Sequence, residues 1–333
     1  MPPNRSRLGG PDRRTLLAAL AGTGLAMPFI ARAQGAYPDR PLRIIVNFAP
    51  GGPTDIIARL LSVPLSAALG QPVVVENRAG AGGNIGIAAT ARSTPDGYTL
   101  LITSSAYVVN PSLYSNVPYD AFRDFAPVAE LGTSPNIILA NPASGITSLG
   151  DLVAKAKAAP GTLSYASPGS GTTPHLAGEL LKLRAGVDIL HVPFNGAGPA
   201  IQAILSGTVP VASTALPPAQ PQVKAGALRG LAVTGAQRWP DLPDVPTAEE
   251  AGVSGLVSET FQALLAPAGT PKPIVDRLTR DTLAVLAQPA MRQRLQESGF
   301  AVLAGGQDAL AKRIAEEVPM WRDVITRSGV KAD

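Results

Sequence analysis

The spacing of apolar positions predicts strands that each run into a glycine turn and then a helix. The short apolar run at residues 43–46 is typical of a buried strand, and the prolines and glycines at 50–53 end it. Apolar residues then recur at steps of three and four until Gly70, which predicts a helix capped by Thr54 or Asp55. The turn therefore points a helix N-terminus, with its unpaired amides and positive dipole end, beyond the end of the strand. A single turn of this kind is ordinary, but several that converge would outline an anion pocket.

The same unit recurs in the first half of the chain. An expected strand at 73–76 leads into a second glycine turn at 77–84, which opens a short helix. A third expected strand, at 98–102, runs towards Ser104 and Ser105, whose hydroxyls are neutral hydrogen-bond donors. Three such units in order imply a parallel sheet with right-handed crossovers.

The second half of the chain repeats the pattern. Expected strands at 163–166 and 189–192 lead into glycine turns, and helices then begin with Pro174 and Pro199. A capping box, with Ser148 at its start, opens another helix before them. The anion-pocket device is therefore expected in both halves of the chain.

Two extended apolar stretches, at 128–140 and 261–266, would carry the chain into a second lobe and back. We therefore predict an α/β fold of two lobes, each a mainly parallel sheet flanked by helices, joined by crossing strands. The expected parts are an export segment at 1–36, a first lobe at 37–130 and 260–333, and a second lobe at 131–259.

The first residues have the pattern of an export signal. Paired arginines at 13–14 precede an apolar run at 16–30, which is too short to span a bilayer comfortably, and Ala33 or Ala36 offers a cleavage site. The paired arginines indicate the twin-arginine route, although Asp12 stands where serine or threonine is usual, so general secretion stays open. We expect the mature protein in the periplasm.

Composition and charge narrow the classes of function. The net charge is +4, but residues 1–36 carry this excess, so the remainder has equal numbers of basic and acidic side chains. A neutral body argues against nucleic acid or an acidic membrane surface as a partner. The chain has no cysteine, and its two histidines, His175 and His191, lie too far apart in sequence to make a metal site by spacing. We expect no metal and no cofactor.

Motifs of catalysis are missing. The turn at 80–86 has Ile85 where a dinucleotide fingerprint needs its third glycine, and no stretch matches a phosphate loop or a nucleophile elbow. We therefore predict that the chain is not an enzyme. One alternative is a secreted hydrolase that pairs Ser170 or Ser104 with His175, although His175 fits packing or capping equally well. A receptor that feeds a sensor kinase is a second alternative. A third is an effector-sensing module of a transcription regulator, but the export leader argues against it.

The glycine turns, taken in order, resemble those of the tripartite tricarboxylate transporter substrate-binding proteins, also called Bug receptors. The matching stretches are 37–38 with Pro41, 50–55, 74–86, 96–100, 169–172 with His175, 191–196, 231–234 and 266–271. The resemblance covers nearly the whole mature chain. It implies a fold of the type II periplasmic binding proteins, a small organic acid with one to three carboxylates in the cleft, and delivery to membrane permease subunits. We expect the receptor to be a monomer.

The resemblance also implies which residues contact the ligand. In the family, amides and hydroxyls of the glycine turns grip ligand carboxylates, partly through water. The corresponding positions are Phe48, Ala49, Gly52, Thr54, Asp55, Asn84, Ser104, Ser105, Ser167, Ser170, Thr172, His175, Asn195 and Gly196. The chain departs from the family at 194–196, where it has Phe-Asn-Gly and the family commonly has Tyr-Lys-Gly. The identity of a relative's ligand therefore does not transfer to this chain.

Overall fold

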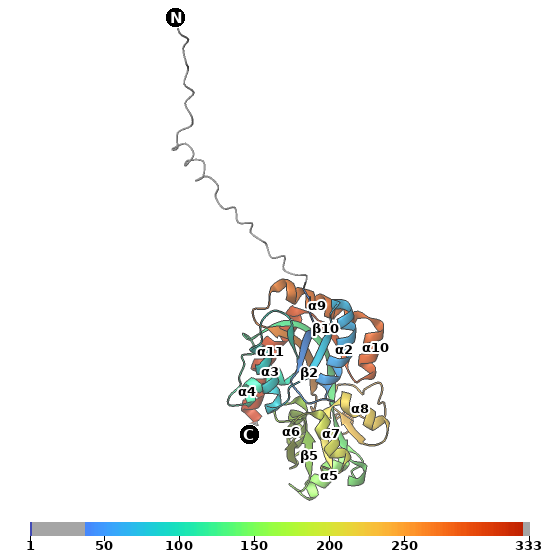
Figure 1. Cartoon of the computed structure of the whole chain (residues 1–333). Coiled ribbons are helices and arrows are strands. Elements are labelled where there is room, and N and C mark those ends of the chain that lie inside the picture. Colours follow the sequence, from blue (N-terminus) through green and yellow to red (C-terminus); the bar gives the residue numbers. More distant parts are fainter. Residues whose placement is uncertain (2–36, 329–333) are drawn as a thin grey trace. The chain divides into compact units, whose positions relative to one another are not determined.

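A ten-stranded mixed sheet with helices packed against it forms the frame of the residues that the structure describes (Figure 1). The computed structural model describes Met1 and residues 37–328, and all the elements named below belong to the compact unit that starts at Pro38. The export segment expected at 1–36 lies outside the described residues, apart from Met1. The described residues include no helix with the length and apolar character needed to cross a bilayer.

The amino-terminal βα group follows the predicted pattern. Its elements are β1 (Leu42–Val46), α2 (Pro53–Leu69), β2 (Val73–Asn77), the 3₁₀ turn η1 (Ala81–Gly83), α3 (Asn84–Ala91) and β3 (Thr99–Ser104). Strand β1 pairs in parallel with β2 on one side and β3 on the other. The apolar residues of β1 are at most 1% exposed, which explains why its sequence is a continuous apolar run and not an alternating one.

Two long strands, β4 (Phe125–Ala140) and β9 (Glu259–Pro267), cross the middle of the sheet. Up to Pro135, β4 pairs antiparallel with β9, and from Asn136 it pairs with β7 and β8 instead. The βα units are parallel as expected, whereas the crossing strands are antiparallel, so the sheet as a whole is mixed. The exact ranges of the two lobes stay a prediction.

The second βα group is built on the far part of β4. Its elements are η2 (Pro142–Ser144), α5 (Leu149–Ala158), β5 (Ser164–Ser167), α6 (Thr173–Ala185), β6 (Leu190–Pro193), α7 (Ala197–Leu205), β7 (Val211–Ala215), α8 (Leu216–Lys224) and β8 (Arg229–Val233). Strand β5 pairs in parallel with β6 and β7. The glycine turns after β5 and β6 therefore open at the same edge of the sheet.

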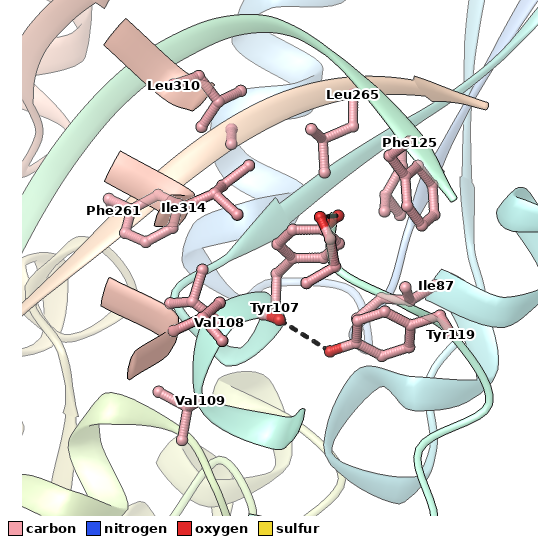
Figure 2. Packing of buried hydrophobic residues seen from close by; sticks show 14 of the residues in the cluster. Ile87, Tyr107, Val108, Val109, Tyr119, Phe125, Phe261, Leu265, Leu310 and Ile314 are labelled. Atoms are coloured by element: carbon pink, nitrogen blue, oxygen red, sulfur yellow. Dashed lines mark hydrogen bonds between the residues drawn. The ribbon is translucent and has the colours of Figure 1, made fainter. Parts of the chain in front are cut away.

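The remaining elements complete the first group. They are α4 (Ala106–Leu113), α9 (Lys272–Ala287), α10 (Pro289–Glu297), β10 (Ala301–Gly305) and α11 (Gln307–Ser328). Figure 2 shows the core where α4 and α11 meet, with Tyr107 stacked on Tyr119 at 5.4 Å between ring centroids. The hydroxyl of Tyr119 donates to the carbonyl of Tyr107 at 2.9 Å, so both the ring and the polar end of the side chain are satisfied. This packing anchors the end of β3, where Ser104 lies.

Some sequence-based expectations are wrong. Neither Thr54 nor Asp55 caps α2, because Gly52 is the N-cap and both residues lie within the first turn. The stretch after Ser105 contains helix α4, which was not predicted because Pro111 lies inside it. Helix α8 was missed for the same reason, since three prolines occur in its nine residues. Helix α10 and the bulged strand β10 were also missed.

Candidate functional site

Four helix N-termini meet around one small cavity. Three of them belong to the second βα group, at the N-caps Thr172 of α6, Gly196 of α7 and Ala215 of α8, and the fourth is the N-cap Gly52 of α2. The cavity has a volume of about 20 Å³, room for about one water molecule. We call it the helix-end cavity, and its lining is Phe48, Gly52, Pro53, Thr54, Ser104, Pro168, Thr172, Thr173, Pro174, Ala197, Ala215 and Thr260.

The helix-end cavity is electropositive without a cation. The first amides of a helix have no acceptor within that helix, and the aligned peptide dipoles add a partial positive charge at the same end. None of the lining residues carries a charged side chain. Proline in the first turn of α2, α6 and α8 costs no hydrogen bond, because that amide would be unpaired anyway.

The hydroxyl of Thr54 is a second group in this cavity that could bind a ligand. The side chain lines the helix-end cavity and is 1% exposed, yet its oxygen has no hydrogen-bond partner among the described residues. A buried hydroxyl without a partner costs free energy, so native structures usually satisfy it with water or a ligand.

A larger cavity of about 200 Å³ adjoins the first, and the two share Phe48 and Pro168 as a common wall. We call it the glycine cavity. Its lining is Phe48, Gly80, Ala81, Gly82, Gly83, Tyr114, Pro168, Gly169, Ser170, Pro193, Phe194 and Asn195. Glycine is required at Gly82, because its φ is +60° and a Cβ there would lie 2.3 Å from the hydroxyl oxygen of Tyr114.

The two βα groups touch each other around these cavities. The hydroxyl of Tyr114, just beyond α4, donates to the carbonyl of Ser170 at 3.0 Å. Ala49 of the first turn lies against Gly196, and the hydroxyls of Thr173 and Thr260 are hydrogen-bonded. The structure is therefore a closed arrangement, in which the first turn and the turns of the second group face each other directly.

The turn after β5 rests on two stacked histidines. The rings of His175 and His191 lie 4.1 Å apart, and Nε2 of His191 is 2.6 Å from the hydroxyl of Ser167. The amide of Gly171 donates to Nδ1 of His175 at 3.3 Å, which requires that nitrogen to be unprotonated. Burial lowers the pKa of His175 to about 4 and that of His191 to about 3, so both rings are neutral at pH 7.

The first turn rests on a carboxylate instead. Asp55 is 4% exposed and accepts hydrogen bonds from the amide of Gly51 at 3.0 Å and from Nδ2 of Asn77 at 2.9 Å. It also forms an ion pair with Arg59 at 2.9 Å. Burial raises the pKa of Asp55, but the hydrogen bonds from Arg59, Gly51 and Asn77 outweigh it and hold the pKa below its usual value.

Half of the fourteen residues predicted from the sequence line one of the two cavities. These are Phe48, Gly52, Thr54, Ser104, Ser170, Thr172 and Asn195. The others lie behind the cavity walls: Ala49, Asp55, Asn84, Ser105, Ser167, His175 and Gly196.

The residues behind the walls mostly hold the walls in position. The hydroxyl of Ser105 accepts from the amide of Phe261 at 2.9 Å, and Oδ1 of Asn84 accepts from Asn110 at 2.8 Å. Ser167 accepts from the amide of Gly169 at 3.2 Å, and His175 and Asp55 accept from the amides of Gly171 and Gly51. Direct contact between these side chains and a ligand stays a prediction.

Several lining residues were not predicted from the sequence as contacts. The glycine turn at 80–83 was noticed as a turn but not as part of the site. Tyr114 was missed because nothing predicted α4, and Phe194 because it was weighed only as a departure from a family motif. For Phe194 the available signal was its place directly before the glycine turn at 195–198, whereas no glycine turn lies near Tyr114 in the sequence.

Comparison with known proteins connects this site with one family. A sequence profile described as "Tripartite tricarboxylate transporter family receptor" matches residues 57–330. The chain belongs to this family. Protein BugT of Bordetella pertussis is 38% identical over 321 residues, which cover 95% of this chain and 98% of BugT. The predicted family is therefore confirmed.

Solved structures of the family confirm the fold class. The chain is 34% identical to R. palustris Rpa4515, described with adipate, with a TM-score of 0.86 over 89% of this chain and 99% of the other. It is also 34% identical to MatC (Rpa3494) from Rhodopseudomonas palustris, described with bound malate, with a TM-score of 0.82 over 87% of this chain and all of the other. The family is one of substrate-binding receptors, which fits a site built from amides and hydroxyls.

Proposed function

We propose that the chain is a periplasmic receptor that captures a small organic acid, with one carboxylate group in the helix-end cavity, and delivers it to a membrane permease. The convergence of four helix N-termini on a cavity with no charged lining carries this proposal. Each helix end stabilises a nearby anion by roughly 0.3–1 kcal/mol, and by up to about 2 kcal/mol when partly buried. Four such ends, with charge-assisted amide hydrogen bonds, can replace an arginine or lysine.

The two βα groups should close around the ligand, because the four helices whose N-termini face it come from both groups. Helix α2 belongs to the first group and α6, α7 and α8 to the second, so only the closed arrangement surrounds a carboxylate with all four ends. A ligand that makes more contacts in the closed form shifts the population towards it. The ligand replaces water in the cavity, and the permease recognises the closed receptor.

The relatives support the chemical class of the ligand. The two structural relatives are described with adipate and with malate, both of which are small organic acids. The family description supports a permease of the tripartite type as the partner, and the basic and apolar leader supports export to the periplasm.

A hydrolase is the weaker candidate. Among the described residues, the serine that hydrogen-bonds a histidine is Ser167, and its exposure is 0%. Because burial holds the pKa of His191 at about 3, this imidazole is a poor general base at neutral pH. The hydroxyls of Ser104 and Ser170 do line the cavities, but neither makes a hydrogen bond to His175 in the part of the chain that the structure describes.

The hydroxyl of Thr54 offers the direct test. We expect Thr54→Val to weaken carboxylate binding about tenfold, because the variant keeps the shape but removes a buried donor. Isothermal titration against malate, adipate and benzoate measures the change. Thr282→Val is the matched control, because Thr282 is also fully buried with an unpaired hydroxyl but lies in α9 outside both cavities. No binding of any carboxylate to the wild-type chain, or equal affinities for both variants, would refute the proposal.

A further inference from the structure

The turn at 80–83 presents amides, and not carbonyls, to the glycine cavity. Gly80, Ala81 and Gly82 all line this cavity, and their amides donate to no acceptor among the described residues. Their carbonyls are paired instead, either with amides at the start of α3 or with Nδ2 of Asn110. A wall with unpaired donors and occupied acceptors favours a ligand group that accepts hydrogen bonds.

The backbone conformation of this turn suits an anion. All four residues have positive φ, from +47° at Ala81 to +131° at Gly80. A turn of this kind can bring successive N–H groups to one side, where they form a concave anion site. Gly83, the N-cap of α3, also lines the cavity, so the positive end of a helix dipole adds to the same wall.

The second βα group supplies further donors to the glycine cavity. Ser170 and Asn195 line it, and their amides also donate to no acceptor among the residues that the structure describes. The carbonyl of Ser170 is paired, because it accepts from the hydroxyl of Tyr114 at 3.0 Å. None of the lining residues carries a charged side chain, so no carboxylate of the protein competes for these amides.

Asn47 lies directly behind the turn. Its side chain is 0% exposed, and neither Nδ2 nor Oδ1 has a hydrogen-bond partner among the described residues. A Cβ on Gly83 would lie 2.2 Å from Nδ2, so this nitrogen is directed at the wall of the cavity. Buried amides usually bond to water or a ligand where no protein group serves. Nδ2 of Asn47 is therefore one more donor at this wall that could bind a ligand.

We infer that the glycine cavity is a second carboxylate subsite and that the preferred ligand is a linear dicarboxylate, with one carboxylate in each cavity. A carboxylate that enters the glycine cavity loses its hydration, and charge-assisted hydrogen bonds from the amides of both βα groups replace it. The inference rests on the proposed function, because that function fixes the position of the first carboxylate only.

The residues that the two cavities share favour an apolar chain between the carboxylates. Phe48 and Pro168 line both cavities, so the atoms that connect the two ends of the ligand pass these apolar side chains. The volume of about 200 Å³ leaves room for methylene groups beside the second carboxylate. An unbranched methylene chain gains burial there without adding a polar group that needs a partner.

A binding series on the full chain tests the inference. Isothermal titration compares succinate, glutarate and adipate, each with its own monomethyl ester, at one pH and salt concentration. Each ester keeps the chain of its diacid but has one negative charge fewer. We expect the diacid that binds most tightly to exceed its monoester at least about tenfold in affinity. A monoester that binds as tightly as its diacid would overturn the inference while leaving the proposed function standing. Failure of all six to bind would overturn the inference and, if benzoate also failed, the proposed function.

A negative charge added to the glycine cavity should weaken the diacid selectively. Asn195→Asp puts a carboxylate at an exposed lining position, so we expect the affinity for the diacid to fall roughly two- to fivefold and that for the monoester to change less than about twofold. Gln296→Glu is the matched control, because it makes the same charge change on an exposed residue of α10 outside both cavities. Equal changes for the two ligands in Asn195→Asp, or a diacid affinity that matches that of Gln296→Glu, would refute the inference.

Discussion

The two turns that face each other across the helix-end cavity are supported by opposite chemistry. Behind the first turn lies Asp55, an ionised carboxylate bonded to Gly51, Asn77 and Arg59. Behind the second lie His175 and His191, two neutral rings stacked on each other. Asp55 and His175 are buried and His191 is half-buried, and none of the three lines either cavity.

The difference follows from the hydrogen bonds that Asp55 and His175 accept. Asp55 accepts hydrogen bonds from a backbone amide and two side chains, so a negative charge suits its site. His175 must offer an unprotonated nitrogen to the amide of Gly171, so a positive charge there would break the contact. The first turn therefore depends on a charge being present, and the second on a charge being absent. Each dependence can be tested separately.

Removal of the charge behind the first turn should have the largest effect. We expect Asp55→Asn to lower the free energy of unfolding by roughly 2–4 kcal/mol, because Arg59 loses its carboxylate partner and the amide of Gly51 loses a charged acceptor. Affinity for carboxylates should fall by more than tenfold, since the first turn no longer holds its shape. Urea unfolding and isothermal titration measure the two effects.

Asp281→Asn is the control for the first turn. Asp281 is also buried, at 8% exposure, and its carboxylate accepts from Arg277 and Arg280, but it lies in α9 away from both cavities. It should lose stability without losing affinity once the protein is folded. If Asp55→Asn behaved in the same way, the carboxylate would support the fold alone and not the shape of the turn.

The histidine pair predicts a fall in stability at mildly acidic pH. The folded pKa values, about 4 for His175 and about 3 for His191, lie below the usual 6.5, so between these limits the unfolded chain binds more protons. The stabilisation is complete above pH 6.5 and is lost as the pH falls towards 4, at up to about 1.4 kcal/mol per pH unit for each histidine. Asp55 has a pKa below its usual 3.8, so its stabilisation is fully present above this pH and is lost only as the pH falls further.

Denaturant unfolding at pH 7.5, 6.5, 5.5 and 4.5 measures this dependence. His191→Gln should reduce the slope between pH 6.5 and 4.5, because one of the two titrating groups is gone. Glu179 raises the pKa of His175 and Lys182 lowers it, and both residues are kept in the variant. An unchanged slope in the variant would contradict the assignment of the pH dependence to the pair.

The sequence predicted most of the frame and part of the site. Local signals were sufficient for the βα units, since a buried apolar run, a glycine turn and a proline at the first helical turn all act within a few residues. Gly70 ends α2 in the left-handed conformation as expected. Thr54 and Thr172, which line the helix-end cavity, were expected from the family resemblance, whose matching stretches include the turns that they belong to.

What the sequence could not show depends on contacts between distant segments. Tyr114 and Ser170 meet across 56 positions, and α4 forms in spite of Pro111 because tertiary packing around Tyr107 outweighs the local cost of the proline. The role of Asp55 as a support was also hidden. A carboxylate beside a glycine turn has the same sequence signature whether it faces a ligand or turns back to Arg59 and Gly51.

Loss of the hydrogen bond between Tyr114 and Ser170, which joins the first βα group to the second turn, should have the smallest effect. Tyr114→Phe removes the hydrogen bond to the carbonyl of Ser170 but keeps the ring over Gly82, so the closed form loses about 1 kcal/mol relative to the open one. We expect affinity for benzoate to fall roughly two- to fivefold, mainly through faster dissociation, which stopped-flow fluorescence can follow. Tyr119→Phe is the control, because it removes a hydrogen bond of similar length inside one core, shown in Figure 2, and should lower stability without changing affinity. Equal dissociation rates in wild type and Tyr114→Phe would mean that closure depends on the ligand and the backbone contacts near Gly196, with no contribution from this hydroxyl.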